Sequence, residues 1–228
     1  MKKLAFVFAA AAMLFTSCSK DDDNGGGSSE TINYLPLKAG NTWTYKATNN
    51  KTSTSASYTL TATGTTETHN GKTYTVLTSS AGSSAKELYN VTGKSYTQYG
   101  ALSDLGANIE LNYLAGNNNK GDKWSQTGLS ATVSGFAATF SINYEITDKL
   151  ATTTVNGKTY TDVAVVKLTI ADLKISGATV GITSQNIEMQ IAKNVGKIKQ
   201  KLNVVIGLPV PDATINTELE LTNSNITL

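Results

Sequence analysis

The chain of 228 residues contains no arginine, one cysteine, one histidine and three prolines. Without guanidinium groups, bidentate recognition of phosphate or carboxylate is excluded, so any anion must be held by lysine or by backbone amides. His69 stands beside an Asn-Gly turn, where we expect it to be exposed and not to serve a zinc site or a Ser-His pair. Because Cys18 is the single cysteine, no internal disulfide is possible.

Other sites with a recognisable spacing are also missing. The acidic residues are scattered, and no two are placed so that glycoside hydrolysis would follow. Residues 21–24 do not open a calcium loop, because no frame gives acids at the first, third and fifth places with glutamate at the twelfth. Glycines 25–27 follow no predicted strand and precede no predicted helix, as a phosphate cradle would require. We predict no catalytic residue, no metal and no cofactor; a hydrolase with an unrecognised carboxylate pair is an alternative.

A long unbroken apolar run occurs near the amino terminus. Two lysines precede the run at residues 4–15, and about 12 residues at roughly 1.5 Å each are too few to span ~30 Å of hydrocarbon. The run is typical of the core of a secretory signal peptide, which we place at residues 1–17.

The residues around the cysteine resemble a bacterial lipobox. Phe15-Thr16-Ser17 precede Cys18, with Phe15 at the place where the family usually has leucine and Leu14 just before it. The resemblance implies that Cys18 becomes the first residue of the mature chain and carries a diacylglyceryl thioether and an N-acyl group. Three acyl chains on one residue would make membrane anchoring stable, whereas one chain gives marginal binding.

An acidic run follows the cysteine and consists of Ser19, Lys20, Asp21, Asp22 and Asp23. It resembles the tract that exports lipoproteins to the outer surface in the Bacteroidota, and the alternative is a solvated run that holds a tether off the membrane. Residues 18–30, which end in glycines and serines, are predicted to be that flexible tether. The resemblance implies a lipid anchor in the outer membrane with the protein facing the cell exterior; a periplasmic orientation is the alternative.

Charge excludes one further class of function. Without the first 17 residues the chain carries 17 lysines and 17 acidic residues, so its formal charge is zero. A nucleic-acid-binding protein needs a cationic excess to release counterions. We therefore expect no nucleic-acid partner.

Residues 31–228 predict one all-β domain. Alternating apolar residues predict strands at 58–63 and 186–191, and the repeated sequence Asn-Gly-Lys-Thr-Tyr-Thr at 70–75 and 156–161 predicts two tight hairpins. This repeat indicates either a duplicated half-domain or two hairpins with the same turn. The clearest alternation places six residues on one face of a strand: Phe136, Ala138, Phe140, Ile142, Tyr144 and Ile146. We predict a single antiparallel domain, either a strongly curved sheet or an incomplete barrel, with a β-sandwich as the alternative.

Two segments resemble the opening and the closing parts of secreted Bacteroidota lipoproteins of unassigned function. Residues 36–45 match the pattern PLK-x-GN-x-W-x-Y, and residues 195–199 match VG-x-I/V-K. We expect Trp43 to anchor the core and not to stack on a ligand.

Five residues are candidates for ligand binding: Phe136, Phe140, Ile142, Tyr144 and Trp124. Trp124 lies in the Gly- and Asn-rich stretch 100–129, which predicts a long irregular loop with a binding edge. The other four would line a concave face, and lipoprotein-carrier half-barrels, which the chain resembles in strand content and size, leave such a face open. We expect a non-enzymatic, membrane-anchored binding module for a hydrophobic or glycan ligand or a protein partner. A structural subunit of an outer-membrane assembly is the alternative, and a packed interior with an exposed apolar patch would favour it.

Overall fold

The computed structural model describes residues 33–82, 85–100, 109–115, 117–133, 135–207 and 214–226, and none of these lies in a helix. The predicted signal peptide, Cys18 and the acidic tether lie outside the described residues. The strands are β1 (Thr42–Asn49), β2 (Thr54–His69), β3 (Lys72–Ser79), β4 (Lys86–Thr92), β5 (Ser95–Tyr99), β6 (Glu110–Leu114), β7 (Lys123–Val133), β8 (Phe136–Val155), β9 (Lys158–Ile175), β10 (Ala178–Thr179), β11 (Ile182–Ala192), β12 (Gly196–Ile206) and β13 (Thr214–Ser224).

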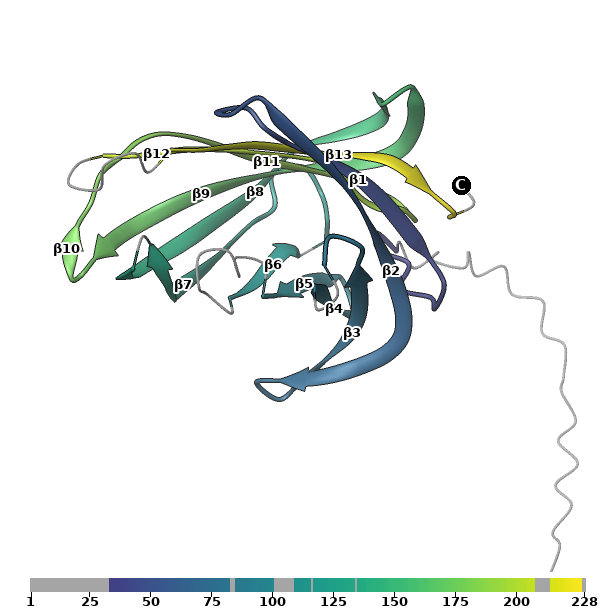
Figure 1. Cartoon of the computed structure of the whole chain (residues 1–228), viewed down its shortest axis with the longest axis horizontal. Coiled ribbons are helices and arrows are strands. Elements are labelled where there is room, and N and C mark those ends of the chain that lie inside the picture. The colour runs from purple at the N-terminus through teal and green to yellow at the C-terminus, as the bar shows by residue number, and fades with distance from the viewer. Residues whose placement is uncertain are drawn as a thin grey trace, which may run out of the picture. The chain divides into compact units, whose positions relative to one another are not determined.

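Twelve strands form one antiparallel sheet in the order β6-β5-β4-β3-β2-β1-β13-β12-β11-β9-β8-β7, and β10 pairs with β9 (Figure 1). The sheet curves until its two end strands, β6 and β7, meet at one seam, so it is nearly closed as a barrel. The prediction of an incomplete barrel is confirmed, and the β-sandwich alternative is wrong. The last strand of the chain, β13, lies between β1 and β12, so the sheet is completed by its carboxyl-terminal segment.

The two Asn-Gly turns were predicted correctly. In each hairpin both turn residues have positive φ, 51° and 77° at Asn70-Gly71 and 48° and 77° at Asn156-Gly157. Positive φ at both central residues is the requirement of a type I′ turn, whose twist matches that of the flanking strands. The turns connect β2 to β3 and β8 to β9.

The prediction of an irregular loop over residues 100–129 is wrong for its described part. Apolar and aromatic residues alternate there at Leu111 and Tyr113 and again from Trp124, and the structure forms β6 and most of β7 from them. The glycine and asparagines at 117–121 instead lie in the connection between these two strands, where Asn118 and Gly121 have positive φ.

The strand that begins at Phe136 carries the predicted inward face, with one exception. Phe140, Ile142, Tyr144 and their apolar neighbours on that face are buried, whereas Phe136 is 55% exposed. Phe136 pairs only with the end of β7, because the pairing of β8 with β9 starts at Ala138. Phe136 is in phase with the buried residues of β8, but among the described residues only β7 pairs with it.

The two lipoprotein-like segments pack against each other although about 150 residues separate them. Trp43 is 1% exposed, and its Nε1 donates a hydrogen bond of 2.6 Å to the carbonyl of Val195. The Tyr45 hydroxyl donates to the carbonyl of Lys197 at 2.8 Å. Gly196 lies between these contacts with φ +105°, and a Cβ added there would be 2.9 Å from Cδ1 of Leu35. Trp43 is thus a core anchor, as predicted.

Tyr34 closes the same end of the barrel. Its side chain is fully buried, and its hydroxyl donates to Oδ1 of Asp162 at 3.2 Å. Lys149 contacts both groups: its Nζ is 2.8 Å from Oδ1 of Asp162 and 4.7 Å from the centre of the Tyr34 ring. Burial acts to raise the pKa of Asp162, but the bonds from Lys149 and Tyr34 outweigh it, and the pKa is lowered. The cluster therefore holds the segment before β1 against β8 and β9.

An unfavourable positive φ alone costs about 1–3 kcal/mol. We predict that Gly196→Ala lowers the free energy of unfolding by more than this, because the added Cβ also contacts Leu35. Gly177→Ala is the matched control, since Gly177 has φ +81° with no atom within 4 Å of the added Cβ, and it should lose the conformational part alone. Urea unfolding of both variants measures the difference. Equal losses would show that the approach of Leu35 is unimportant.

Candidate functional site

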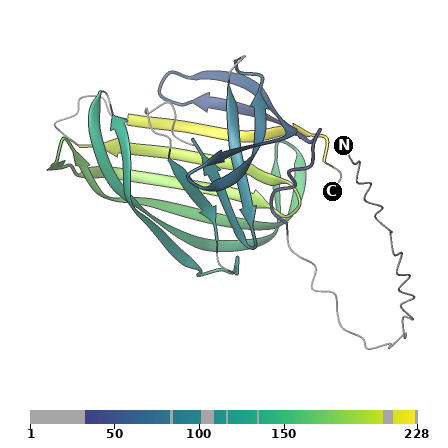
Figure 2. The ribbon, with the colours of Figure 1, turned by 90° about the horizontal axis from the view of Figure 1, so that it is seen from below.

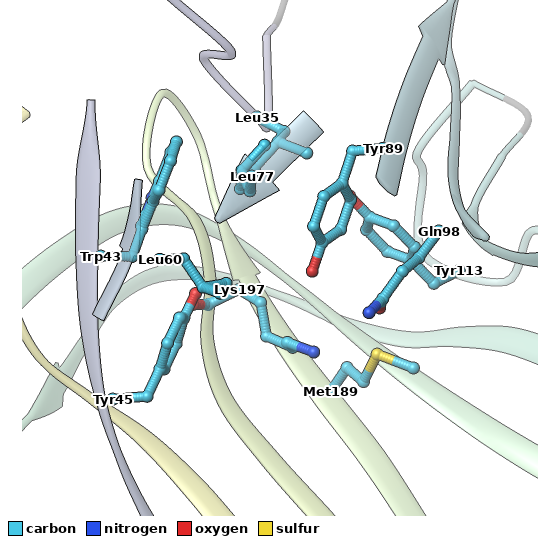
Figure 3. A pocket seen from close by; sticks show the side chains of 10 residues that line it. All are labelled: Leu35, Trp43, Tyr45, Leu60, Leu77, Tyr89, Gln98, Tyr113, Met189 and Lys197. Carbon is cyan, nitrogen blue, oxygen red and sulfur yellow. The ribbon is translucent and has the colours of Figure 1, made fainter. Parts of the chain in front are cut away.

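A small cavity of about 10 Å³ lies inside the barrel (Figure 3). Its wall is largely aromatic and aliphatic, and Gln98 and Lys197 contribute polar groups. Such a volume is about that of one water molecule. The part of the interior near Trp43 is thus filled by the protein's own side chains.

An acidic residue, Glu87, faces this interior from β4. It pairs across the sheet with the buried residue Leu77, which fixes its inward direction. Its Oε2 accepts hydrogen bonds from the Tyr89 hydroxyl at 2.5 Å and from Nε2 of Gln98 at 2.9 Å. Burial first, and then the charge of Glu87, raise the pKa of Tyr89 well above its ordinary value. The phenol therefore stays protonated and continues to donate.

Lys197 reaches the cavity from β12, and Figure 3 shows its amine pointing inward near Met189 and Gln98. Nζ donates to Oε1 of Gln200 at 2.9 Å. No carboxylate within the described ranges forms an ion pair with it, and Glu87, which faces the same interior, accepts from Tyr89 and Gln98. Burial lowers the pKa of Lys197, and the charge of Glu87 opposes this shift only in part.

An apolar concave face continues outward from Lys197. Gln200 pairs with Met189 on one side and with Leu219 on the other, so the three side chains share the inner face. Leu202 follows on the same face of β12, and both leucines are half-buried and packed against the core. The long strands β8 and β9 extend well past the short strands β4–β6 (Figure 1, Figure 2). Leu202 and Leu219 keep part of their surface exposed, whereas Val204, two residues beyond Leu202 on the same face, is buried.

Side chains close the seam between β6 and β7. The amide of Gln126 accepts from the backbone N–H of Asn112 at 2.9 Å and donates to the backbone carbonyl of Glu110 at 2.9 Å. Nε1 of Trp124 donates to the carbonyl of Asn112 at 2.6 Å. Tyr144 completes the group, since its hydroxyl donates to Gln126 at 2.6 Å and its ring stacks on Trp124 with centroids 5.2 Å apart. These bonds replace the backbone ladder that is missing there.

The structure brings four of the five candidate residues together. Trp124 lies at the seam with Tyr144 stacked on it, Phe140 and Ile142 are buried in the core on the same strand as Tyr144, and Phe136 lies apart at the exposed hairpin. Their role as ligand contacts remains a prediction.

Neither Lys197 nor Glu87 is predicted as an interior residue from the sequence. The pairing of β11 with β12 shifts register so that Ile191 faces Lys197 while Gln190 faces Lys199, and this bulge leaves Lys197 inward despite the buried residue next to it. Glu87 had a usable signal, because it alternates in phase with Tyr89 and Val91.

The convex side of the sheet carries a polar groove of about 460 Å³ over β7, β8 and β9. Ser125, Asn143 and Lys167 contribute to it, and Lys123 and Glu145 form an ion pair of 3.4 Å at its side. An exposed pair of this kind contributes little to stability. The groove on the convex side is thus lined by polar residues, whereas the concave face of the same sheet is apolar.

No group of three or more acidic, histidine or cysteine side chains among the described residues is arranged to hold a metal ion. The part of the chain that the structure describes has no helix long and apolar enough to span a membrane.

Comparison with known proteins finds no matching family model and no matching curated protein. A solved structure from Parabacteroides distasonis, described as a candidate lipoprotein, is similar with a TM-score of 0.54 at 14% identity, covering 86% of this chain and 99% of that chain. The chain shares its fold with that protein. A second structure, from Bacteroides fragilis and described as a candidate exported protein with a YmcC-like fold, has a TM-score of 0.46 at 10% identity, with 85% and 99% covered.

We predict that Lys197→Met raises the free energy of unfolding by about 1 kcal/mol at neutral pH, because it removes a partly buried cation without a carboxylate partner. The folded pKa lies below the ordinary value of 10.5, so the unfolded chain binds more protons between the two values. The cost of the lysine is complete below the folded pKa and disappears as the pH rises toward 10.5.

Urea unfolding of both proteins between about pH 7 and pH 10 should therefore show a stability difference that shrinks with rising pH. The interior phenols Tyr45, Tyr89 and Tyr113 stay protonated over this range because burial raises their pKa values. Glu87 is present in both proteins. A difference that stays constant across the range would contradict the assignment of the cost to Lys197.

Proposed function

We propose that the protein is a lipid-anchored lipoprotein of the bacterial envelope that binds an apolar ligand on the concave face of its incomplete barrel and catalyses no reaction. Two half-buried leucines, Leu202 and Leu219, carry this proposal, because they pack against the core on the concave face and keep part of their surface exposed. Contiguous apolar surface that stays accessible commonly marks a binding site.

The anchor is proposed from the sequence around Cys18. The apolar leader, the lipobox-like residues before Cys18 and the acidic run 19–23 support acylation and export to the outer surface of the outer membrane. The description of the Parabacteroides distasonis protein as a candidate lipoprotein agrees with this part of the proposal. A structural subunit of an outer-membrane assembly is the second reading, supported by the exposed Phe136.

We predict that Cys18→Ala abolishes incorporation of labelled palmitate and releases the protein from the membrane fraction, because the acyl chains would be lost. Ser19→Ala is the control and should retain both label and membrane attachment. The measurement is metabolic labelling followed by fractionation of cells that produce each variant. Membrane retention of unlabelled Cys18→Ala protein would refute the anchor.

The ligand is tested with the soluble Cys18→Ala chain and the neutral apolar dye Nile red. Leu202→Gln should weaken dye binding roughly tenfold, since it places an amide in the apolar surface. Lys201→Gln creates the same residue at the neighbouring outward position and should leave binding unchanged. Absence of dye binding to the parent chain would favour the structural reading.

A further inference from the structure

The end strand β7 has an open backbone edge. It pairs with β8 on one side, and on the other side only the side chains of Trp124 and Gln126 bond to β6 (Figure 1). A bulge follows directly, because the register against β8 shifts between Gln126 and Leu129 and Gly128 has φ +67°. From Leu129 to Val133, no described residue makes a hydrogen bond to the backbone of β7 on the side away from β8.

The edge of β9 shows how the chain closes another place where strands diverge. Where β11 leaves β9, Gln185 bonds to the backbone N–H and the carbonyl of Ile170. Further along β9, the N–H of Val180 donates to the carbonyl of Leu173 at 2.9 Å, and β10 pairs with the residues that follow. The edge of β9 is thus satisfied within the chain, whereas the edge of β7 after its bulge is not.

The free edge of β7 also lacks the residues that commonly protect an exposed strand. Lysine, other charged residues and proline prevent edge-to-edge pairing in natural sheets. Residues 125–144, which include this edge and the hairpin to β8, contain no charged residue and no proline. An edge of this kind accepts a further extended strand through backbone hydrogen bonds.

The side-chain pattern of β7 fits a second copy of the same strand. Ala131 is buried and Leu129 packs against the core, whereas Ser130 and Thr132 are exposed. Directly opposite residues of antiparallel strands point to the same face, so a two-fold pairing centred on Ala131 sets inward residues opposite inward residues. A pairing shifted by one residue would set Leu129 opposite Thr132 and mix the two faces.

The same register accounts for the exposure of Phe136 in the single chain. Within one chain Phe136 pairs with Val133, and Phe140 pairs with Leu129. Centring on Ala131 sets Val133 opposite Leu129 of the second copy, so one row runs from Phe136 through Val133 to Leu129 and Phe140 of the second copy. The apolar row that ends at a 55% exposed Phe136 in one barrel would thus continue into the next.

We propose that two copies of the chain join through the free edges of β7, in an antiparallel pairing centred on Ala131 that makes one continuous sheet of both barrels. The contact is confined to residues 129–133 and is smaller than the roughly 1,200–2,000 Å² of a stable complex, so we expect a dissociation constant in the micromolar range. This inference does not depend on the proposed ligand.

The test changes the two outward residues that face each other across the proposed axis. Ser130 and Thr132 are exposed, so substitution there should leave the fold intact. Ser130→Lys/Thr132→Lys sets lysine opposite lysine at both positions and should weaken the dimer at least about tenfold. Ser130→Lys/Thr132→Glu sets lysine opposite glutamate at both positions and should dimerise at least as tightly as the parent.

The measurement is sedimentation equilibrium at low ionic strength, over micromolar to millimolar concentrations. It uses the chain from Ser19 onward, which contains every described residue and lacks the apolar leader, so the leader cannot cause association. Thr159→Lys/Thr161→Lys is the matched control, because it adds the same charge at exposed positions of β9 beside the Asn156 turn and should dimerise as the parent does.

Three outcomes would overturn the proposal. A parent chain that stays monomeric over the whole range would show that the edge of β7 does not join two copies. Unchanged dimerisation of Ser130→Lys/Thr132→Lys would place the contact on another surface. Equal weakening of both charged β7 variants would show that the pairing is not centred on Ala131.

Discussion

The hydrogen bond from the indole of Trp43 to the carbonyl of Val195 ties the first strand of the barrel to the turn before β12, across the position where β13 is inserted. The rest of the architecture depends on this contact, because β13 pairs with β1 and β12 and both must be in place to receive it. Gly196 has no side chain at the point where Leu35 approaches, which lets the two segments meet. Segments far apart in sequence are thus joined by one buried donor, and contacts of such high sequence separation are typical of slowly folding β proteins.

Glutamine side chains extend the sheet where backbone pairing stops. Gln126 bonds to the backbone of β6 at the seam, and Gln185 does the same between β11 and β9, where its amide accepts from the N–H of Ile170 at 2.7 Å and donates to the carbonyl of that residue at 3.1 Å. A primary amide has the same donor and acceptor groups as a peptide unit, so it satisfies backbone groups that would otherwise be left without partners. The same device at two places allows a strongly curved sheet to diverge without losing hydrogen bonds.

Local patterns in the sequence predicted much of this fold, while the features that depend on neighbouring strands were not accessible. The hairpin at Asn70-Gly71 and the buried Trp43 follow from backbone preference and side-chain size, which act locally. The burial of Phe136 depends on whether another strand passes over it, and no alternation encodes that. Lys197 looks like an outward lysine in a polar strand, and only the register shift of β12 against β11 turns it inward. The cavity that Lys197 reaches is also lined by Tyr113 from β6. This strand was not predicted, because residues 100–129 are rich in glycine and asparagine.

The seam between β6 and β7 determines where the wall of the barrel would open if its interior had to hold more. Between β6 and β7 the described contacts are three hydrogen bonds between side chains of β7 and the backbone of β6, each contributing about 0.5–1.5 kcal/mol, whereas every other join in the wall is a backbone ladder. Because β6 and β7 follow one another along the chain, parting them disturbs no strand order. Opening the barrel along this line would break only the bonds that Trp124 and Gln126 make to β6, and it would leave every backbone ladder intact.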